Sequence, residues 1–242
     1  MIKISVCCIT YNRPHLLGEM IQSFLMQDYP KDYCELIILD DGGQYGDIRG
    51  DNWQIVSFSR RFGSLCQKRN ACISLSSREF THLAIADDDD IYLPWWLAYH
   101  ARNFERGSLW SSSNQNYIST ANSEIAKQSI GTNGCVFHPG HAFAKSAFWQ
   151  VGGYSALADY DDLDLFHKLR ESGIIPVEAI NYGEAPFLIY RRFPNENHMS
   201  CVSLDEYNRT LAPSLSSANL DIGWKIDYLK QVEEFERQSV NI

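Results

Sequence analysis

Residues 81–90, THLAIADDDD, place four consecutive aspartates directly after a run with the length and apolar character of a strand. A series of like charges is usually a solvated loop, because adjacent carboxylates repel one another. Here an equally apolar stretch, residues 91–97, follows at once, so the carboxylates lie between two segments that we expect to be buried. Buried carboxylates need a compensating charge. A hard divalent cation supplies it with one or two protein ligands and leaves positions for phosphates, so the sequence predicts a Mg²⁺ or Mn²⁺ site here.

The composition fits one large domain that binds a small ligand. The chain has 242 residues, 45% of them hydrophobic and 13% aromatic, which is enough for a sizeable core. A net charge of −9 argues against nucleic acid as the main partner. Three basic pairs can nevertheless neutralise a phosphorylated ligand: Arg60-Arg61, Lys68-Arg69 and Arg191-Arg192.

The cysteines and the N-terminus predict a cytoplasmic protein. The seven cysteines include the adjacent pair Cys7-Cys8 but no Cys-x-x-Cys spacing, which suits buried reduced thiols rather than a disulfide framework. A strand begins at the N-terminus without a signal peptide, and no apolar run approaches the ~18 residues of a membrane span. Peripheral contact with the inner face of a membrane is compatible with these features.

Strand-like and helix-like segments alternate through the first half of the chain. Apolar runs predict strands at residues 2–10, 34–39, 53–58 and 81–86, and helical spacing predicts helices after Pro14 and over 67–76. This alternation with short turns is typical of a parallel α/β sheet. Right-handed crossovers bring the carboxyl ends of such strands to one rim. The polar residues at three strand ends, 10–12, 40–41 and 87–90, therefore predict a binding rim.

The second half is less regular. Residues 110–132 are rich in Ser, Asn and Thr, and we expect loops there. The remaining patterns predict a short helix at 143–151, a helix at 162–169 that ends at Gly173, strands at 174–180 and 186–190, and an amphipathic C-terminal helix. We expect this last helix to pack on the chain itself, with a dimer or membrane contact as the alternatives.

Six segments carry motifs that occur together in one enzyme family: residues 8–13, 27–42, 68–70, 87–94, 152–165 and 190–200. In this order they resemble the inverting nucleotide-sugar glycosyltransferases of the GT-A fold, in the family 2-like group of bacterial polysaccharide enzymes. The resemblance covers residues 2–200 and implies a mostly parallel central sheet flanked by helices. It also implies a single domain over 1–242, with a nucleotide-binding half (1–90), a loop-rich acceptor-binding and catalytic half (91–205) and a helical tail (206–242).

The resemblance assigns eight residues to the nucleotide sugar: Thr10, Tyr11, Asn12, Arg13, Asp40, Arg69, Asp87 and Asp88. Tyr11 would lie near the base, for which an aromatic face is a suitable platform. Asp40 would accept hydrogen bonds from the base or ribose, with Asp41 as the less favoured candidate. Arg69 would lie near the diphosphate. The alternative for Tyr11 is an ordinary packed tyrosine, and the alternative for Arg69 is an arginine on the surface of a helix.

The aspartate run matches the metal-binding Asp-x-Asp segment of the family. By register, Asp87 would lie near the ribose and Asp89 would bind the Mn²⁺ or Mg²⁺ between the two phosphates. Asp88, where the family usually has a small residue, could replace either by a slip of one residue, and Asp90 would lie behind the ligands. His198 matches a histidine that reaches the metal or diphosphate in some relatives, with an ordinary loop histidine as the alternative.

Inversion at the sugar carbon needs a general base on the face opposite the leaving group. Alignment with the family assigns this role to Asp162, although Asp161 stands where the family usually has Glu. Like charges at Asp159, Asp161 and Asp164 are expected to raise the pKa of Asp162. The alternative is that residues 161–162 only cap the following helix.

The histidines at Cys135-x-x-His138-x-x-His141 do not match a common zinc spacing. We leave His138 and His141 as candidates for lining the acceptor site.

Together these features predict a metal-dependent inverting enzyme that moves one sugar from a nucleotide-diphosphate sugar to a carbohydrate or lipid-linked glycan, in glycan or polysaccharide biosynthesis. The Gln-x-x-Arg-Trp motif of processive synthases is absent from the sequence. One alternative is a non-catalytic nucleotide-sugar-binding subunit. A sugar-phosphate nucleotidyltransferase is less favoured, because residues 11–14 do not form a glycine-rich phosphate loop.

Overall fold

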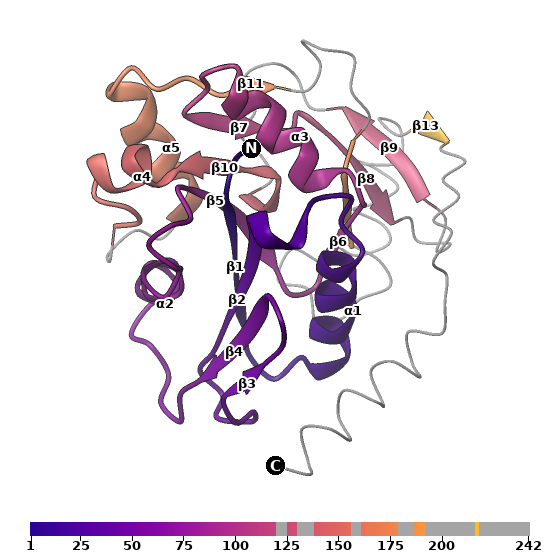
Figure 1. The fold of residues 1–242 in the computed structure, drawn as a ribbon, viewed down its shortest axis with the longest axis vertical. Coiled ribbons are helices and arrows are strands. Elements are labelled where there is room, and N and C mark those ends of the chain that lie inside the picture. The colour runs from indigo at the N-terminus through magenta and orange to yellow at the C-terminus, as the bar shows by residue number, and fades with distance from the viewer. Residues whose placement is uncertain (120–124, 130–137, 156–160, 179–185, 192–215, 218–242) are drawn as a thin grey trace, which may run out of the picture.

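A computed structural model describes residues 1–119, 125–129, 138–155, 161–178, 186–191 and 216–217 (Figure 1). An eight-stranded sheet has the order β11-β7-β10-β5-β1-β2-β4-β3. In chain order its strands are β1 (Ile4–Thr10), β2 (Cys34–Asp40), β3 (Ile48–Arg49), β4 (Trp53–Ser57), β5 (His82–Asp87), β7 (Trp110–Ser112), β10 (Ala142–Ala144) and β11 (Val177–Glu178).

A second sheet of short strands has the order β13-β9-β8-β12-β6. Its strands are β6 (Ile91–Tyr92), β8 (Gln115–Ser119), β9 (Ile125–Ser129), β12 (Leu188–Tyr190) and β13 (Ser216–Ser217). The helices are α1 (Pro14–Leu25), α2 (Leu65–Ser74), α3 (Trp96–Glu105), α4 (Lys145–Gln150) and α5 (Asp161–Glu171), with short 3₁₀ turns η1 (Lys31–Tyr33) and η2 (His138–Gly140).

The centre of the main sheet is parallel, as the sequence predicts. Strand β1 pairs in parallel with β2 and β5, and β2 pairs in parallel with β4. The register places Thr10 beside Asp40 and Ile9 beside Asp87, so the predicted polar strand ends do share one rim. Strands β10, β7 and β11 extend the same sheet from beyond residue 90, with β10 antiparallel to both of its neighbours. The predicted α/β class is confirmed as a mixed sheet.

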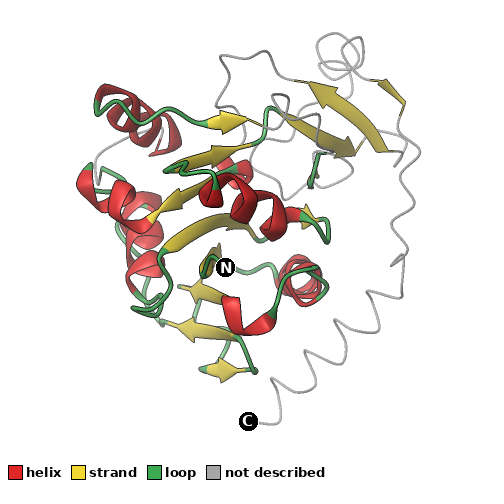
Figure 2. Cartoon of the chain, turned by 45° about the horizontal axis from the view of Figure 1, so that its top comes forward, coloured by secondary structure: helices red, strands yellow, loops and turns green. Residues whose placement is uncertain are grey.

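Helices cover both faces of this sheet (Figure 2). Helices α1 and α3 pack in one core with alternate β1 residues such as Val6 and Cys8, and α2, α4 and α5 pack in the other with Cys7 and Ile9. Strand β1 is therefore buried on both faces along its whole length. This explains why its sequence is a continuous apolar run instead of an alternating one.

Several boundaries differ from the sequence-based predictions. The loops expected at 110–132 include strands β7, β8 and β9, whose polar residues are held by pairing with neighbours rather than by an apolar pattern. The helix expected at 143–151 begins as strand β10 and becomes α4 only at Lys145. Helix α3 was not predicted. The predicted amphipathic C-terminal helix lies outside the described residues, and the proposed division of the domain stays a prediction.

The described cysteines are buried and form no disulfide: Cys7, Cys8, Cys34, Cys66 and Cys72. Within the described ranges, each helix is too short or too polar to cross a membrane.

The turn after α4 is held by α2. Asn70 donates its side-chain amide to the Tyr154 carbonyl (2.8 Å) and accepts the Tyr154 N–H (3.1 Å). Gly152 and Gly153 both have a positive φ, at +80° and +64°. A Cβ on Gly153 would lie 2.7 Å from Asn70 Oδ1 and 2.9 Å from Phe148 Cε1, whereas a Cβ on Gly152 would meet no atom within 4 Å.

We therefore expect Gly153→Ala to lower the free energy of unfolding by about 3 kcal/mol, because it adds a clash to the left-handed backbone strain. Gly152→Ala, the matched control, carries only the strain and should cost about 1 kcal/mol. Urea denaturation of both variants checks this. Equal losses would show that the contact with Asn70 does not constrain the turn.

Candidate active site

A cavity of about 640 Å³ opens at the predicted rim. Eight of the residues predicted from the sequence line it: Thr10, Tyr11, Arg13, Arg69, Asp87, Asp88, Asp89 and Asp162. They come from β1, β5, α2, α5 and the adjoining turns, so segments more than 150 residues apart in the chain meet at one opening. Asn12 and Asp40 do not line this cavity, and His198 lies outside the described residues.

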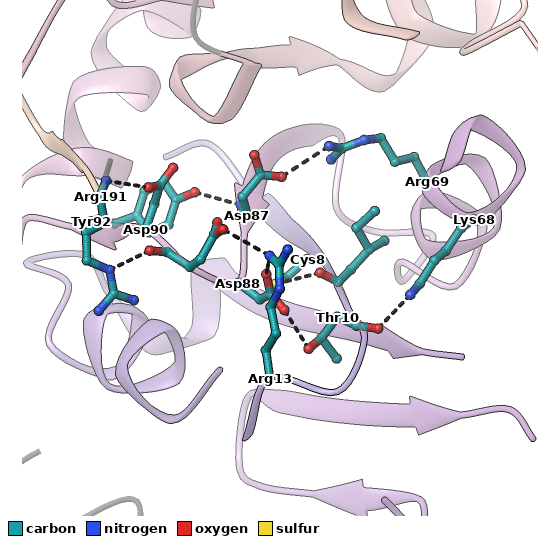
Figure 3. Close-up of polar contacts among 12 residues, drawn as sticks. Cys8, Thr10, Arg13, Lys68, Arg69, Asp87, Asp88, Asp90, Tyr92 and Arg191 are labelled. Atoms are coloured by element: carbon teal, nitrogen blue, oxygen red, sulfur yellow. Dashed lines mark hydrogen bonds and ion pairs between the residues drawn. The ribbon is translucent and has the colours of Figure 1, made fainter. Parts of the chain in front are cut away.

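Asp88 and Asp89 form a buried pair of adjacent carboxylates in the cavity wall, exposed by 3% and 4%. Arg13 Nη1 donates to Asp88 Oδ1 (3.0 Å; Figure 3). It also donates to Asp89 Oδ2 (2.9 Å), and thus bridges the two carboxylates. The hydroxyl of Thr10 donates to the second oxygen of Asp88 (2.7 Å). Asp88 is therefore fixed by two elements, the end of β1 and the start of α1.

Asp87 is more open to the cavity. Its backbone N–H donates to the hydroxyl oxygen of Tyr92 (2.7 Å), which fixes the direction in which the strand ends. Its carboxylate accepts a hydrogen bond from Arg69 Nη2 (3.1 Å). Asp87 and Arg69, whose contact is drawn in Figure 3, thus line the cavity on the side of α2.

Arg191, just after β12, secures the far end of the aspartate run. Its backbone N–H donates to Asp90 Oδ1 (3.0 Å), and its side chain donates Nε–H to the carbonyl of Asp89 and forms an ion pair with Glu19 of α1. Asp90 is fully buried, and its other oxygen, Oδ2, has no hydrogen-bond partner among the described residues. Asp90 is not among the residues that line the cavity, and its place behind the metal ligands stays a prediction.

The pKa values of Asp88, Asp89 and Asp90 are raised, which indicates that the positive charges around these carboxylates do not fully compensate them. Burial, together with the charge of Asp89, raises the pKa of Asp88 to about 6. Burial and the charge of Asp87 raise the pKa of Asp89 to about 6. Burial and the same neighbours raise the pKa of Asp90 well above its ordinary value. A further cation at this site would therefore be favourable.

These side chains fit a hard divalent cation. Carboxylate oxygens are its preferred ligands. The hydrogen bonds described above for the aspartates leave the buried Oδ2 of Asp90 unused among the described residues. Within the described part of the chain, no three acidic, histidine or cysteine side chains converge as a complete ligand set. The protein would thus supply one or two ligands and leave the rest to phosphates and water, as magnesium sites commonly do.

Asp41 lies at the cavity in place of Asp40. The Asp40 carboxylate is fully buried and accepts hydrogen bonds from the Gly42 N–H (2.8 Å) and the Ser57 hydroxyl (2.7 Å), which shape the turn after β2. Asp41 accepts from the Phe62 N–H (3.1 Å) and pairs with Lys68. Burial raises the pKa of Asp41, but these hydrogen bonds outweigh it and hold the pKa below its ordinary value. The assignment of Asp40 to the base or ribose stays a prediction.

Helix α2 begins at the cavity, where the Ser64 hydroxyl caps it by accepting the Gln67 N–H (3.2 Å). Lys68, in its second turn, donates to the Thr10 carbonyl (2.6 Å) and to Asp41. Lys68 is buried, so its charge is committed to holding β1, the Asp41 turn and α2 together.

Tyr11 and Arg61 form a second feature of the opening. The Arg61 guanidinium lies 3.6 Å from the centre of the Tyr11 ring and 3.2 Å from Asp41 Oδ2. Tyr11 is 40% exposed and lines the cavity, and its assignment to the base stays a prediction. The sequence marked Arg61 only as one of a basic pair. Its stacking on Tyr11 was not predicted.

Asp162 lies in the first turn of α5 and lines the cavity together with His138. His138 is buried, and its Nε2 is hydrogen-bonded to the Tyr154 hydroxyl (2.6 Å). His141 is instead a core residue that accepts from Trp110 Nε1 (2.7 Å) and packs on Phe166. The two histidines therefore have different surroundings, and only His138 reaches the cavity.

Two residues that support the aspartates, Glu19 and Tyr92, carry no signal in the local sequence. Glu19 appears as one of several polar positions on α1, and Tyr92 as part of an apolar stretch. Their partners lie 172 and 5 residues away, and only the fold brings Glu19 to Arg191.

The chain matches the description "Glycosyl transferase family 2" over residues 5–156, which is more than half of its length. It belongs to that family. The predicted family and enzyme class are thereby confirmed, and the matched range contains β1, the aspartate run and the Gly152-Gly153 turn. No curated protein matches the chain in sequence.

Solved structures show the same fold. S. aureus TarS (residues 1–349) in complex with UDP-GlcNAc is 17% identical, with a TM-score of 0.62 over 86% of this chain and 64% of that one. The same TarS region without a named ligand is 15% identical (TM-score 0.60, over 79% and 61%). A mannosyltransferase from Pyrobaculum calidifontis, in complex with GDP-Man and Mn²⁺, is 16% identical (TM-score 0.57, over 78% and 56%). The chain thus spans less than two thirds of these proteins.

The raised pKa values predict how metal-free stability depends on pH. Because the folded pKa of Asp88 lies near 6, above its ordinary 3.8, its contribution is present below about pH 4 and is lost as pH rises through 6. Between pH 4 and 7 this lowers the free energy of unfolding by on the order of 2 kcal/mol, and we expect Asp88→Asn to abolish that decrease. Denaturation of wild type and variant across this range, in chelator, measures it.

The comparison with the variant is needed because buried histidines act in the opposite direction. Burial lowers the pKa of His82 to about 4 and that of His141 to about 3, so their contributions are lost as pH falls. Both histidines are unchanged in Asp88→Asn. Parallel pH profiles for the two proteins would contradict the raised pKa of Asp88.

Proposed function

We propose that this chain transfers a single sugar, with inversion, from a nucleotide-diphosphate sugar to a hydroxyl of a carbohydrate or lipid-linked glycan, and that it depends on Mn²⁺ or Mg²⁺. The observation that carries the proposal is the meeting of Asp162 with Asp87, Asp88 and Asp89 on one cavity. A base and a phosphate-binding acidic cluster on the same cavity are the two parts that such a transfer needs. The setting would be glycan or polysaccharide biosynthesis in the cytoplasm.

The donor is expected to lie along the rim with its base over Tyr11 and its diphosphate at the aspartates. The neighbouring solved structures include complexes of TarS with UDP and with UDP-GlcNAc, and of the mannosyltransferase with GDP-Man and Mn²⁺. In this chain Arg69 lines the cavity beside Asp87 and can donate to a phosphate oxygen. Arg61, stacked on Tyr11, bounds the base end.

Asp89 and one neighbouring aspartate would hold the metal, with Arg191 fixing the Asp89 backbone through its carbonyl. A bound Mn²⁺ or Mg²⁺ would offset the negative charge that grows on the leaving diphosphate. Asp162 would accept the proton of the acceptor hydroxyl as its oxygen attacks the anomeric carbon. The bond from that carbon to the diphosphate oxygen breaks in the same displacement, and its electron pair leaves with the nucleoside diphosphate.

A thermal-shift screen of nucleoside diphosphates and nucleotide sugars, with and without Mn²⁺, tests donor binding. A ligand that binds the folded state raises the melting temperature by mass action. We expect one base to give a Mn²⁺-dependent shift, and Asp89→Asn to abolish that dependence because it removes a metal ligand. The absence of a shift with any nucleotide would refute the proposal.

Substitution of the base tests catalysis separately from binding. We expect Asp162→Asn to lower the transfer rate by about 10²–10⁴-fold, the usual contribution of a general base, while the donor shift stays unchanged. Asp164→Asn is the matched control, since Asp164 lies on the same helix and pairs with Lys168 (3.1 Å) instead of lining the cavity. If the wild type binds the donor but neither transfers the sugar nor hydrolyses the donor, the protein is better explained as a non-catalytic subunit.

A further inference from the structure

Arg13 is placed between the two carboxylates that a metal would need. It precedes Pro14 at the start of α1, and a single nitrogen, Nη1, lies 3.0 Å from Asp88 Oδ1 and 2.9 Å from Asp89 Oδ2 (Figure 3). Both carboxylates are buried, whereas the Arg13 side chain is 22% exposed and lines the cavity. The guanidinium is therefore a cation held at the mouth of the acidic pair.

The other basic residues of the cavity have different anchors. Lys68 is bound to Asp41 and to the Thr10 carbonyl, and Arg69 donates to Asp87. These carboxylate contacts are with Asp41 and Asp87, whereas those of Arg13 are with Asp88 and Asp89. Of these three basic residues, Arg13 is the one whose contacts described above are with the carboxylates expected to bind a divalent cation.

We propose that Arg13 is the resident counter-ion of the Asp88–Asp89 pair, that a divalent metal displaces it, and that the displaced guanidinium then binds the donor diphosphate. The inference rests on the proposed function, because it concerns the same metal and donor. Two cations in contact with the same carboxylates repel each other, so binding of the metal works against the Arg13 contacts. A phosphate that shares the metal with Asp89 lies beside Arg13, whose five N–H donors suit phosphate oxygens.

The consequence is a thermodynamic coupling between metal and nucleotide. Without nucleotide, the metal must break the contacts of Arg13 with Asp88 and Asp89 and gains no phosphate ligand in return, so it binds weakly. With nucleotide, the diphosphate takes up the displaced guanidinium, and the metal binds more tightly. By linkage the metal raises nucleotide affinity by the same factor.

The experiment is a titration of Mn²⁺ alone, followed by electron paramagnetic resonance of the free ion, on wild type, Arg13→Met and Arg69→Met. We expect Arg13→Met to tighten Mn²⁺ binding by about tenfold or more, because the competitor of the metal is gone. Arg69→Met removes the same charge from the same cavity but leaves the Asp88–Asp89 bridge in place, so its effect should stay below about threefold. Equal effects of the two variants, or weaker Mn²⁺ binding by Arg13→Met, would overturn the inference.

Repeating the titrations with UDP and with GDP measures the coupling. In the wild type, the nucleotide that binds should raise the affinity for Mn²⁺. In Arg13→Met this nucleotide-induced increase should be smaller, by about the factor by which the substitution raises Mn²⁺ affinity in the absence of nucleotide. An unchanged gain would overturn the exchange while leaving the proposed function intact. If the wild type binds no Mn²⁺ with either nucleotide, the metal-dependent function itself fails.

Arg13→Met also leaves two buried carboxylates without their counter-ion, so its folding needs a check. We expect its metal-free melting temperature to fall and Mn²⁺ to raise it by more than in wild type. Arg13→Lys keeps a charge at this position and should bind Mn²⁺ within about threefold of wild type. If Arg13→Lys bound Mn²⁺ as tightly as Arg13→Met, charge compensation by Arg13 would be refuted.

Discussion

Four adjacent carboxylates at the end of β5, of which Asp88, Asp89 and Asp90 are buried, set the conditions for the rest of the site. Each must be compensated, and the compensating groups come from distant parts of the chain: Arg13 from the start of α1, Arg69 from α2 and Arg191 from the end of β12. The compensation is incomplete, since the pKa values of Asp88 and Asp89 remain raised. The protein thus maintains a local excess of negative charge, which is the physical basis for binding a cation there.

Helix α2 links the parts of the cavity through three consecutive residues. Lys68 holds the end of β1 and Asp41, Arg69 holds Asp87, and Asn70 holds the backbone of Tyr154. Successive residues on a helix point about 100° apart, so three neighbours can reach three different segments. One helix start therefore fixes the nucleotide side and the catalytic side of the rim relative to each other.

The sequence predicts the features that depend on local patterns. The apolar runs identify β1, β2, β4 and β5, and parallel pairing then brings their polar ends to one rim, as observed. It does not predict which of two adjacent carboxylates faces the cavity, because Asp40 and Asp41 are chemically identical and only the hydrogen bonds of the turn distinguish them.

Long-range pairing accounts for most of the rest. Strands β7 and β8 are polar and short, and they are specified by neighbouring strands rather than by their own residues. The contact of Glu19 with Arg191 spans 172 residues and leaves no trace in either local sequence. The placement of Arg13 between two carboxylates likewise depends on the packing of α1 against β6, which follows the aspartates.

The position of Arg191 also has a consequence for the order in which the molecule forms. Strands β1, β2, β4 and β5 and all four aspartates lie within residues 1–90, so they leave the ribosome before Arg191 does. The groups that fix Asp89 and Asp90 from the far side arrive about 100 residues later, with sequence separations of 102 and 101. Contacts between such distant residues form late, because the intervening chain must first be ordered. The nascent chain therefore carries its acidic cluster for some time before the arginine that completes it has been synthesised.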